Sequence, residues 1–143
     1  VRHFNIIPKI ALLSYSNFGS SKGEQAEKMQ KASEYLRKMH PELIIDGEMQ
    51  ANFAVNNELL KEVFPFSNLV GQNVNTLIFP DLASGNIAYK LLQSFGVAEA
   101  VGPVLMGINK PVHVLQIGSS VREIVNMTTI AVVDAQNREQ QMD

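Results

Sequence analysis

The sequence contains no cysteine, no long apolar run and no excess of one charge. Without cysteine, disulfide bonds, cysteine-ligated zinc and a thiol nucleophile are excluded. No window approaches the roughly 18 consecutive apolar residues that span a bilayer. The formal net charge of −2 gives no general field that attracts nucleic acid or an anionic membrane. We therefore expect neither a membrane nor a nucleic acid as a partner.

Length and composition predict a single α/β domain over 1–143. Of the 143 residues, 45% are hydrophobic and 18% are charged, which is enough for one substantial core. The sequence shows no internal repeat, no low-complexity segment and no interdomain linker. The N-terminus has neither an initiator Met nor a signal-peptide pattern. We therefore expect a piece of a longer protein and a cytoplasmic location.

Short apolar segments alternate with helical patterns along the chain. Nearly continuous apolar runs are typical of parallel strands that are buried on both faces. Such runs occupy 8–14, 42–49, 75–80, 99–107 and 111–115. Helices are predicted over 24–39, 56–66 and 81–96, and a closing helix over about 120–137. This alternation predicts a three-layer α/β/α fold with a mostly parallel sheet.

Two of the predicted helices have a recognisable apolar face and candidate capping residues at their starts. The first has an apolar face made of Ala26, Met29, Ala32, Leu36 and Met39. Ser21 and Glu24 fit an S-x-x-E capping box at its start. The closing helix has an apolar stripe made of Val121, Ile124, Val125, Thr128, Ala131 and Val132. Gly118-Ser119-Ser120 precedes this stripe, and Ser119 or Ser120 is expected to cap the helix.

Polar residues follow the predicted strands, where ligands bind in an open parallel sheet. The candidate binding residues are Ser14, Ser16, Asp81, Ser84, Gly85, Asn86, Asn109, Lys110, Gly118, Ser119 and Ser120. This set is rich in hydroxyl and amide groups and contains one lysine. It suits a polar or phosphorylated ligand.

Several of these candidates also have a purely structural interpretation. The Ser-rich turn over 14–21 is either an anion-binding nest or a helix entry. Asp81 or Ser84 is a plausible helix N-cap. Asp46 and Glu48 are either an acid/base or metal pair, or ordinary residues at a strand end. The three histidines are isolated in the sequence, and we predict no metal site.

Five sequence blocks together resemble the phosphate acetyl/butyryltransferase family. They are PKIALLSYSNFGSS, IDGEMQANFAV, IFPDLASGNIAYKLLQSFG, AVGPVLMGINKPVHVL and IVNMTTIAVVDAQ. The resemblance implies a two-domain α/β/α architecture of the phosphotransacetylase and isocitrate-dehydrogenase type. The ligand cleft would lie between the domains, and dimerisation would use mainly the second domain, most of which this chain would supply. The implied chemistry moves an acyl group between coenzyme A and phosphate.

The chain departs from this family's catalytic pattern. Active members carry a pattern like N-D-L-S-R-G-C-S after N-K-P, and a downstream Asp that helps to activate the thiol. At the Ser, Arg and Asp positions this chain has Gln116, Ile117 and Glu123. Isoleucine cannot donate a hydrogen bond to phosphate, so the charge-assisted bonds of the arginine are lost. We therefore expect no catalytic residue and no useful acyl transfer.

The stretch VHVLQIGSSVREIVNMTTIAVVDAQ is similar to the degenerate transferase-like domain of large bacterial malic enzymes. Those enzymes convert malate to pyruvate and CO2, with NADP and a divalent metal held by an upstream module. The resemblance implies a regulatory fragment that binds no cofactor itself, responds to acetyl-CoA and forms a homodimer or higher homo-oligomer. Two alternatives stay open: an active phosphate acyltransferase whose arginine lies upstream, and a purely structural dimerisation module.

Overall fold

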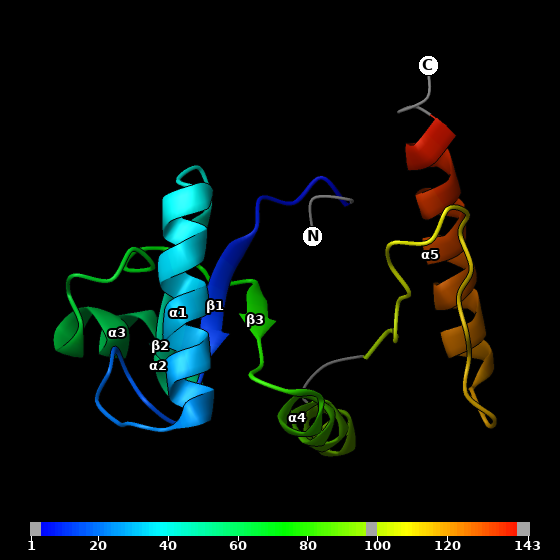
Figure 1. Ribbon diagram of the computed structural model, residues 1–143. Helices are drawn as coiled ribbons and strands as arrows, with labels where there is room; N and C mark the ends of the chain where they lie inside the picture. Colours follow the sequence, from blue (N-terminus) through cyan, green and yellow to red (C-terminus); the bar gives the residue numbers. More distant parts are fainter. Residues whose placement is uncertain (1–3, 97–99, 140–143) are drawn as a thin grey trace. The chain divides into compact units, whose positions relative to one another are not determined.

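The computed structural model describes residues 4–96 and 100–139 (Figure 1). Contacts divide the chain into two compact units, Val1–Ala88 and Tyr89–Asp143, which we call the first and second unit. No helix in the described ranges is long and apolar enough to cross a membrane. The prediction of one domain is not tested by this division and stays a prediction.

The first unit contains a parallel sheet of three strands, in the order β2-β1-β3. They are β1 (Lys9–Leu13), β2 (Ile44–Met49) and β3 (Thr76–Ile78). Ala11, in the central strand, is paired with Asp46 on one side and Leu77 on the other. The predicted strands over 8–14, 42–49 and 75–80 are therefore confirmed, with shorter ends.

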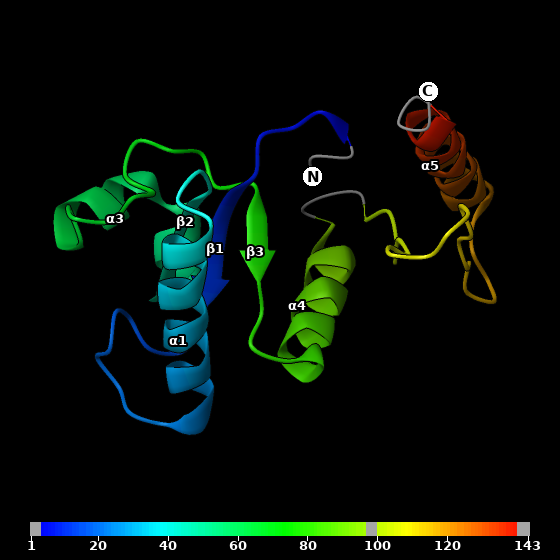
Figure 2. The same ribbon diagram turned by 45° about the horizontal axis from the view of Figure 1, so that its top comes forward.

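Helices cover both faces of this sheet and make the predicted three layers. Leu12 packs with Met29 of α1 (Glu24–Met39) and with Ile45. Its neighbours in β1 point the other way, because successive side chains of a strand alternate between faces. They join a second cluster with α2 (Ala51–Val55) and α3 (Asn57–Val63): Ala11, Leu13, Met49, Ala54, Leu60 and Leu69. Figures 1 and 2 show α1 lying along β1 and β2.

The start of α1 differs from the predicted capping box. Gly23 occupies the N-cap position and makes no side-chain cap hydrogen bond. Glu24 is the first helical residue, whereas a capping box needs its Glu at the third. The backbone N–H of Ser21 donates instead to the hydroxyl of Ser16 at 3.0 Å. The Ser21–Glu24 capping box is therefore wrong, although the helix itself is confirmed.

Two further helices agree closely with the prediction. The helix α4 covers Leu82–Phe95 and the closing helix α5 covers Val121–Glu139. Gly96, which follows α4, has a φ of 64°, a left-handed conformation that glycine adopts at helix ends without steric cost. The short helix α2 has no counterpart in the prediction.

The predicted strands over 99–107 and 111–115 are wrong for the residues that the structure describes. Residues 100–107 and 111–115 contain no strand, and residue 99 lies outside the described ranges. Pro103 and Pro111 lack the N–H that a sheet ladder uses, and Gly102 has a φ of 143°. Apolar content alone suggested strands, but each segment contains a proline that interrupts its row of N–H donors.

A polar cluster ties the 108–113 segment to α5 inside the second unit. Asp134 is buried and accepts a hydrogen bond from Arg138 Nε at 2.8 Å. Arg138 also donates to the carbonyl oxygen of Ile108. His113 Nε2 lies 3.7 Å from Asp134 Oδ2. The segment is therefore held by side chains and not by a sheet ladder.

The apolar stripe predicted for α5 is not buried in the described chain. Met127 and Asp134 are the helix's buried residues. They lie seven positions apart, which places them on one face of a helix. Members of the predicted stripe are exposed: Val121, Ile124, Val125 and Val132.

Candidate functional site

A cavity lies where β1 and β3 end in the first unit, as the parallel topology predicts. Its volume is about 380 Å³, and its wall is mainly apolar. The lining residues are Leu13, Ser14, Tyr15, Gln25, Ala51, Phe79, Pro80, Asp81 and Ser84. Three of the predicted site residues, Ser14, Asp81 and Ser84, are thus brought together. Gly85 and Asn86 lie in α4 and do not line this cavity.

Asp81 is the N-cap of α4, which decides between the two predicted caps. Its Oδ1 accepts a hydrogen bond from the backbone N–H of Ser84 at 2.8 Å, and the Ser84 hydroxyl donates to its carbonyl oxygen. The hydrogen bonds from Ser84 lower the pKa of Asp81, and the charge of Lys28 acts in the same direction. Asp81 therefore presents an ionised carboxylate at the cavity wall.

The Ser-rich turn after β1 surrounds Glu48. Ser16 is fully buried and donates from its hydroxyl to Glu48 Oε1 at 2.8 Å. The backbone N–H of Gly19 donates to the same oxygen at 2.6 Å. Glu48 Oε2 is buried without a hydrogen-bond partner. Ser16 thus organises the turn from inside and does not face the strand-end cavity.

Asp46 and Glu48 have separate partners and do not act as a pair. Asp46 Oδ2 accepts from the Ser67 hydroxyl and from the backbone N–H of Asn68, both at 2.8 Å. Its Oδ1 lies 3.3 Å from a guanidinium nitrogen of Arg37. Both acids are buried, and each accepts hydrogen bonds from a different loop. Within the described ranges, no group of three or more His, Asp or Glu side chains is placed to hold a metal ion.

A tight turn presents Gln116 and Ile117, which the family resemblance aligns with a Ser-Arg pair. The backbone N–H of Ser119 donates to the carbonyl oxygen of Gln116 at 3.1 Å. Gly118 is the third of the four residues in this turn and has a φ of 91°. A positive φ at the third residue is characteristic of a type II turn. Ile117 occupies the tip and is completely exposed, at 108% of its reference area.

Ser120 caps α5, which decides between Ser119 and Ser120. Glu123 Oε2 accepts from the Ser120 backbone N–H at 2.7 Å and from its hydroxyl at 2.9 Å. The Glu123 N–H lies 3.3 Å from the Ser120 hydroxyl, which completes a reciprocal capping box. These bonds from Ser120 lower the pKa of Glu123, and the charge of Lys90 adds to the effect.

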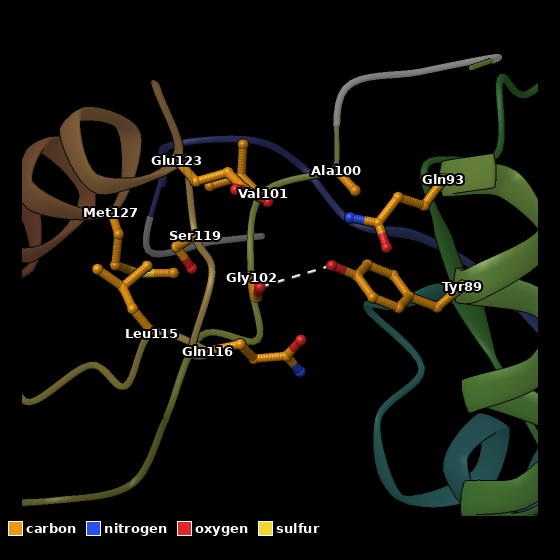
Figure 3. A pocket seen from close by; sticks show the side chains of 10 residues that line it. All are labelled: Tyr89, Gln93, Ala100, Val101, Gly102, Leu115, Gln116, Ser119, Glu123 and Met127. Carbon is orange, nitrogen blue, oxygen red and sulfur yellow. Dashed lines mark hydrogen bonds between the residues drawn. The ribbon is translucent and has the colours of Figure 1, made fainter. Parts of the chain in front are cut away.

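A second, smaller cavity of about 30 Å³ lies in the second unit. Its lining residues are Tyr89, Gln93, Ala100, Val101, Gly102, Leu115, Gln116, Ser119, Glu123 and Met127. Figure 3 shows Tyr89 and Gln93 on one side, and Leu115, Ser119, Glu123 and Met127 on the other. Three of the residues singled out in the sequence, Gln116, Ser119 and Glu123, therefore meet here.

Sequence reasoning missed the α4 side of this cavity. Tyr89 and Gln93 are four residues apart, so they share one helix face, and that spacing is the signal that could have found them. Asn109, Lys110 and Gly118, which were candidates, are exposed and do not line it.

A parallel α/β sheet with a cavity beyond its strand ends is the arrangement in which open α/β folds bind small molecules. The Phosphate acetyl/butaryl transferase family matches residues 1–132. The chain belongs to this family.

Curated relatives come from two kinds of enzyme. The chain is 47% identical over 132 residues to a phosphate acetyltransferase of Clostridium acetobutylicum, covering 92% of this chain and 39% of that protein. It is 48% identical over 139 residues to an NADP-dependent malic enzyme of Escherichia coli, covering 96% of this chain and 18% of that protein. The chain thus spans well under half of these relatives.

Solved structures agree with the fold. The EutD phosphotransacetylase from Staphylococcus aureus matches with a TM-score of 0.83 and 37% identity, covering 94% of this chain and 42% of that one. A phosphotransacetylase from Streptococcus pyogenes matches with a TM-score of 0.82 and 43% identity, covering 96% and 41%. The predicted α/β/α class is confirmed.

Proposed function

We propose that this chain is a catalytically inactive transferase-like region of a malic enzyme, where it binds acetyl-CoA as an allosteric effector. The observation that carries the proposal is Ile117. It stands fully exposed at the tip of its turn, at the position where the family resemblance expects a phosphate-binding arginine. An alkyl side chain at this position supplies no charge-assisted hydrogen bond to phosphate.

Glu123 supports the same proposal. Thiol activation at this position would require a carboxylate free to accept a proton. The carboxylate instead accepts two hydrogen bonds from Ser120, and these lower its pKa. A weaker base that is already bonded is poorly suited to take a proton from a thiol.

The strand-end cavity of the first unit suits a ligand that has both apolar and polar groups. Its wall is mainly apolar, with Ser14, Asp81 and Ser84 as polar groups. Small-molecule sites commonly combine an apolar wall with a few placed polar groups. A site that binds an acyl-CoA without turning it over acts as a sensor, provided that the ligand has different affinities for two states of the enzyme.

The parent reaction would be carried out outside this chain. The NADP-dependent malic enzymes among its relatives are much longer than this chain, which covers 18% of the Escherichia coli protein. In the proposed parent, NADP and a divalent metal would be held by an upstream module, with malate as substrate. A cytoplasmic location is part of the same proposal.

Self-association of this region is also proposed, and the exposed stripe of α5 supports it. Val121, Ile124, Val125 and Val132 leave apolar area in water, and covering such area by a second copy is favourable. Light scattering of the purified protein at several concentrations tests this. A monomer at every concentration would contradict it.

Calorimetry and malate oxidation assays on the full-length protein test the main proposal. We expect acetyl-CoA to bind and to inhibit malate oxidation, and we expect no exchange of acetyl groups between acetyl phosphate and coenzyme A. The proposal fails if near-millimolar acetyl-CoA neither binds nor alters the rate. A dimer without any acyl-CoA effect would instead support a purely structural dimerisation module.

A second candidate function is an active phosphate acyltransferase. The specific observation in its favour is the 47% identity to the Clostridium acetobutylicum phosphate acetyltransferase over 92% of this chain. Its phosphate-binding arginine would have to come from another part of the protein. Release of free thiol from acetyl-CoA in the presence of phosphate, abolished in Glu123→Gln, would establish this function and overturn the first.

A further inference from the structure

We propose that His113 is a pH-sensitive anchor between the 108–113 segment and α5. When the imidazole is protonated, its Nε2–H donates to Asp134 Oδ2 and ties the end of the segment to the helix. When the imidazole is neutral, this tie is lost and the segment is held at its start, where Arg138 donates to the carbonyl oxygen of Ile108. The inference lies within the second unit and does not depend on the proposed function.

His113 is a buried side chain without a hydrogen bond. Its side chain is only 3% exposed, and Nδ1 and Nε2 are both buried without a partner among the described residues. A neutral imidazole has one N–H donor and one acceptor, so neither is satisfied here. Because buried polar groups normally have a partner and an unpaired one costs stability, the neutral imidazole gains nothing from this position.

Asp134 is the acceptor within reach of His113. His113 Nε2 lies 3.7 Å from Asp134 Oδ2, which is too long for a hydrogen bond but close enough for direct attraction between charges. A movement of less than about 1 Å would bring Nε2 to the usual hydrogen-bond distance of about 2.9 Å. A charged donor and a carboxylate form the stronger, charge-assisted class of hydrogen bond.

The charges that face His113 from α5 act in opposite directions. The Asp134 carboxylate attracts an imidazolium, whereas the Arg138 guanidinium, whose Nη2 lies 3.3 Å from the same Oδ2, repels it. Asp134 is 3% exposed and Arg138 is 26% exposed, so water screens the guanidinium more than the carboxylate. Lys110, the charged residue of the segment itself, is exposed. The attraction to Asp134 therefore outweighs the repulsion.

The attraction depends on the pH. It is present when the imidazole is charged, and it is lost as the pH rises through the range of about pH 5–8 in which histidine changes its charge. A neutral imidazole can still carry a proton on Nε2, but it lacks the charge that strengthens the contact. The segment should therefore be more firmly held at acid pH. Since it leads directly into the turn from Gln116 to Ser119, the order of this turn should follow.

Hydrogen–deuterium exchange of the full-length protein, measured by mass spectrometry on peptides from 108–115, tests the inference. After correction for the intrinsic pH dependence of amide exchange, protection should be about five- to tenfold higher near about pH 5.5 than near about pH 8. His113→Gln should remove this difference. His40→Gln is the matched control, because His40 lies 3.5 Å from Glu42 but is 54% exposed, and it should keep the difference.

Exchange of the imidazole C2 proton reports the protonation of His113 in the wild type. Its midpoint should coincide with the pH at which the amide protection of 108–115 changes, and this measurement keeps the test decisive if His113→Gln does not fold. Equal protection at the two pH values, higher protection at the higher pH, or a difference that persists in His113→Gln would overturn the inference. A C2 midpoint that lies apart from the change in protection would also overturn it.

Discussion

At the start of α5, the carboxylate of Glu123 accepts hydrogen bonds from the backbone N–H and the hydroxyl of Ser120. Glu123 Oε2 lies 2.7 Å from the Ser120 backbone nitrogen and 2.9 Å from its hydroxyl oxygen. The family resemblance places a thiol-activating acid at this position. In this chain the carboxylate takes part in the cap of α5. The carboxylate of Glu123 therefore has a structural role at the start of this helix.

The first prediction concerns this cap. Ser120→Ala should lower the free energy of unfolding by about 1 kcal/mol, the usual cost of removing an N-cap side chain. Ser119→Ala, one residue earlier in the same turn, should change it by less than about 0.5 kcal/mol. Urea denaturation of the two variants measures the difference. Equal losses in both would show that Ser120 has no special part in capping.

The second prediction is a pH dependence that follows from Glu123. Its pKa is lowered in the folded chain relative to the ordinary value of 4.5, so the folded state binds the proton less readily than the unfolded state does. The stabilisation by Glu123 is therefore complete above pH 4.5 and is lost as the pH falls through the lower, folded value. In Glu123→Gln this part of the pH dependence should disappear. Identical urea midpoint profiles against pH for wild type and variant would argue against it.

The third prediction concerns the hydrogen bond inside the Ser-rich turn. Ser16→Ala removes a donor to Glu48 and the acceptor for the Ser21 N–H. Leaving such buried groups unpaired costs about 1–3 kcal/mol of stability. Ser21→Ala is the matched control, because Ser21 is exposed, and it should cost less than about 0.5 kcal/mol. If the two variants unfold at the same urea concentration, the Ser16–Glu48 contact does not stabilise the fold.

The fourth prediction compares two glycines with positive φ, Gly47 and Gly71. An added Cβ would clash with other atoms at Gly47 and would meet open space at Gly71. A Cβ at Gly47, which has a φ of 137°, would lie 2.6 Å from the carbonyl oxygen of Leu12, whereas a Cβ at Gly71, with a φ of 77°, meets nothing within 4 Å. Gly47→Ala should therefore cost more than about 3 kcal/mol, or prevent folding. Gly71→Ala should cost only about 1–2 kcal/mol, for the left-handed conformation. Circular dichroism and urea denaturation distinguish these outcomes, and a well-folded Gly47→Ala variant would contradict the packing described.

The fifth prediction concerns Ile117. Because its side chain is fully exposed, Ile117→Arg should change the free energy of unfolding by less than about 0.5 kcal/mol. The new guanidinium should also give the protein measurable affinity for inorganic phosphate, detected by calorimetry, which the wild type lacks. Ile117→Gln, polar but uncharged, is the control and should not gain phosphate binding. Equal phosphate binding by the wild type would remove the main support for an inactive site.

Much of the first unit could be predicted from local sequence. The strands around Ala11, Ile45 and Leu77 are short apolar runs between helices, and this pattern is enough to indicate a parallel sheet covered on both faces. The helix from Glu24 was equally clear from its apolar period. The capping box at Ser21 was wrong, because the exact first residue of a helix depends on the entering turn, which Ser16 and Glu48 organise from inside.

The second unit was predicted less well. The apolar segment around Val112 looks like a strand, but strand formation depends on partners and donors that a local pattern does not contain. The closing helix carries the predicted apolar stripe, yet Asp134 is buried on that helix and Val121, a member of the stripe, is not. Asp134 is flanked by Arg138, one turn along the same helix, and by His113, which is distant in the sequence. A contact between distant segments therefore helps to decide which face is covered.

The sequence by itself determined the family and the parallel α/β class, because these depend on residue identity and on periods within a few residues. Tertiary structure decided that Ser120 and Glu123 cap a helix, that Asp46 and Glu48 serve separate networks, and that Tyr89 reaches the same cavity as Gln116. The physical reason is that hydrogen-bond partners and cavity walls come from distant parts of the chain. The hydrophobic pattern indicates a candidate face in each element, but it does not specify whether that face is buried or which polar atoms meet there.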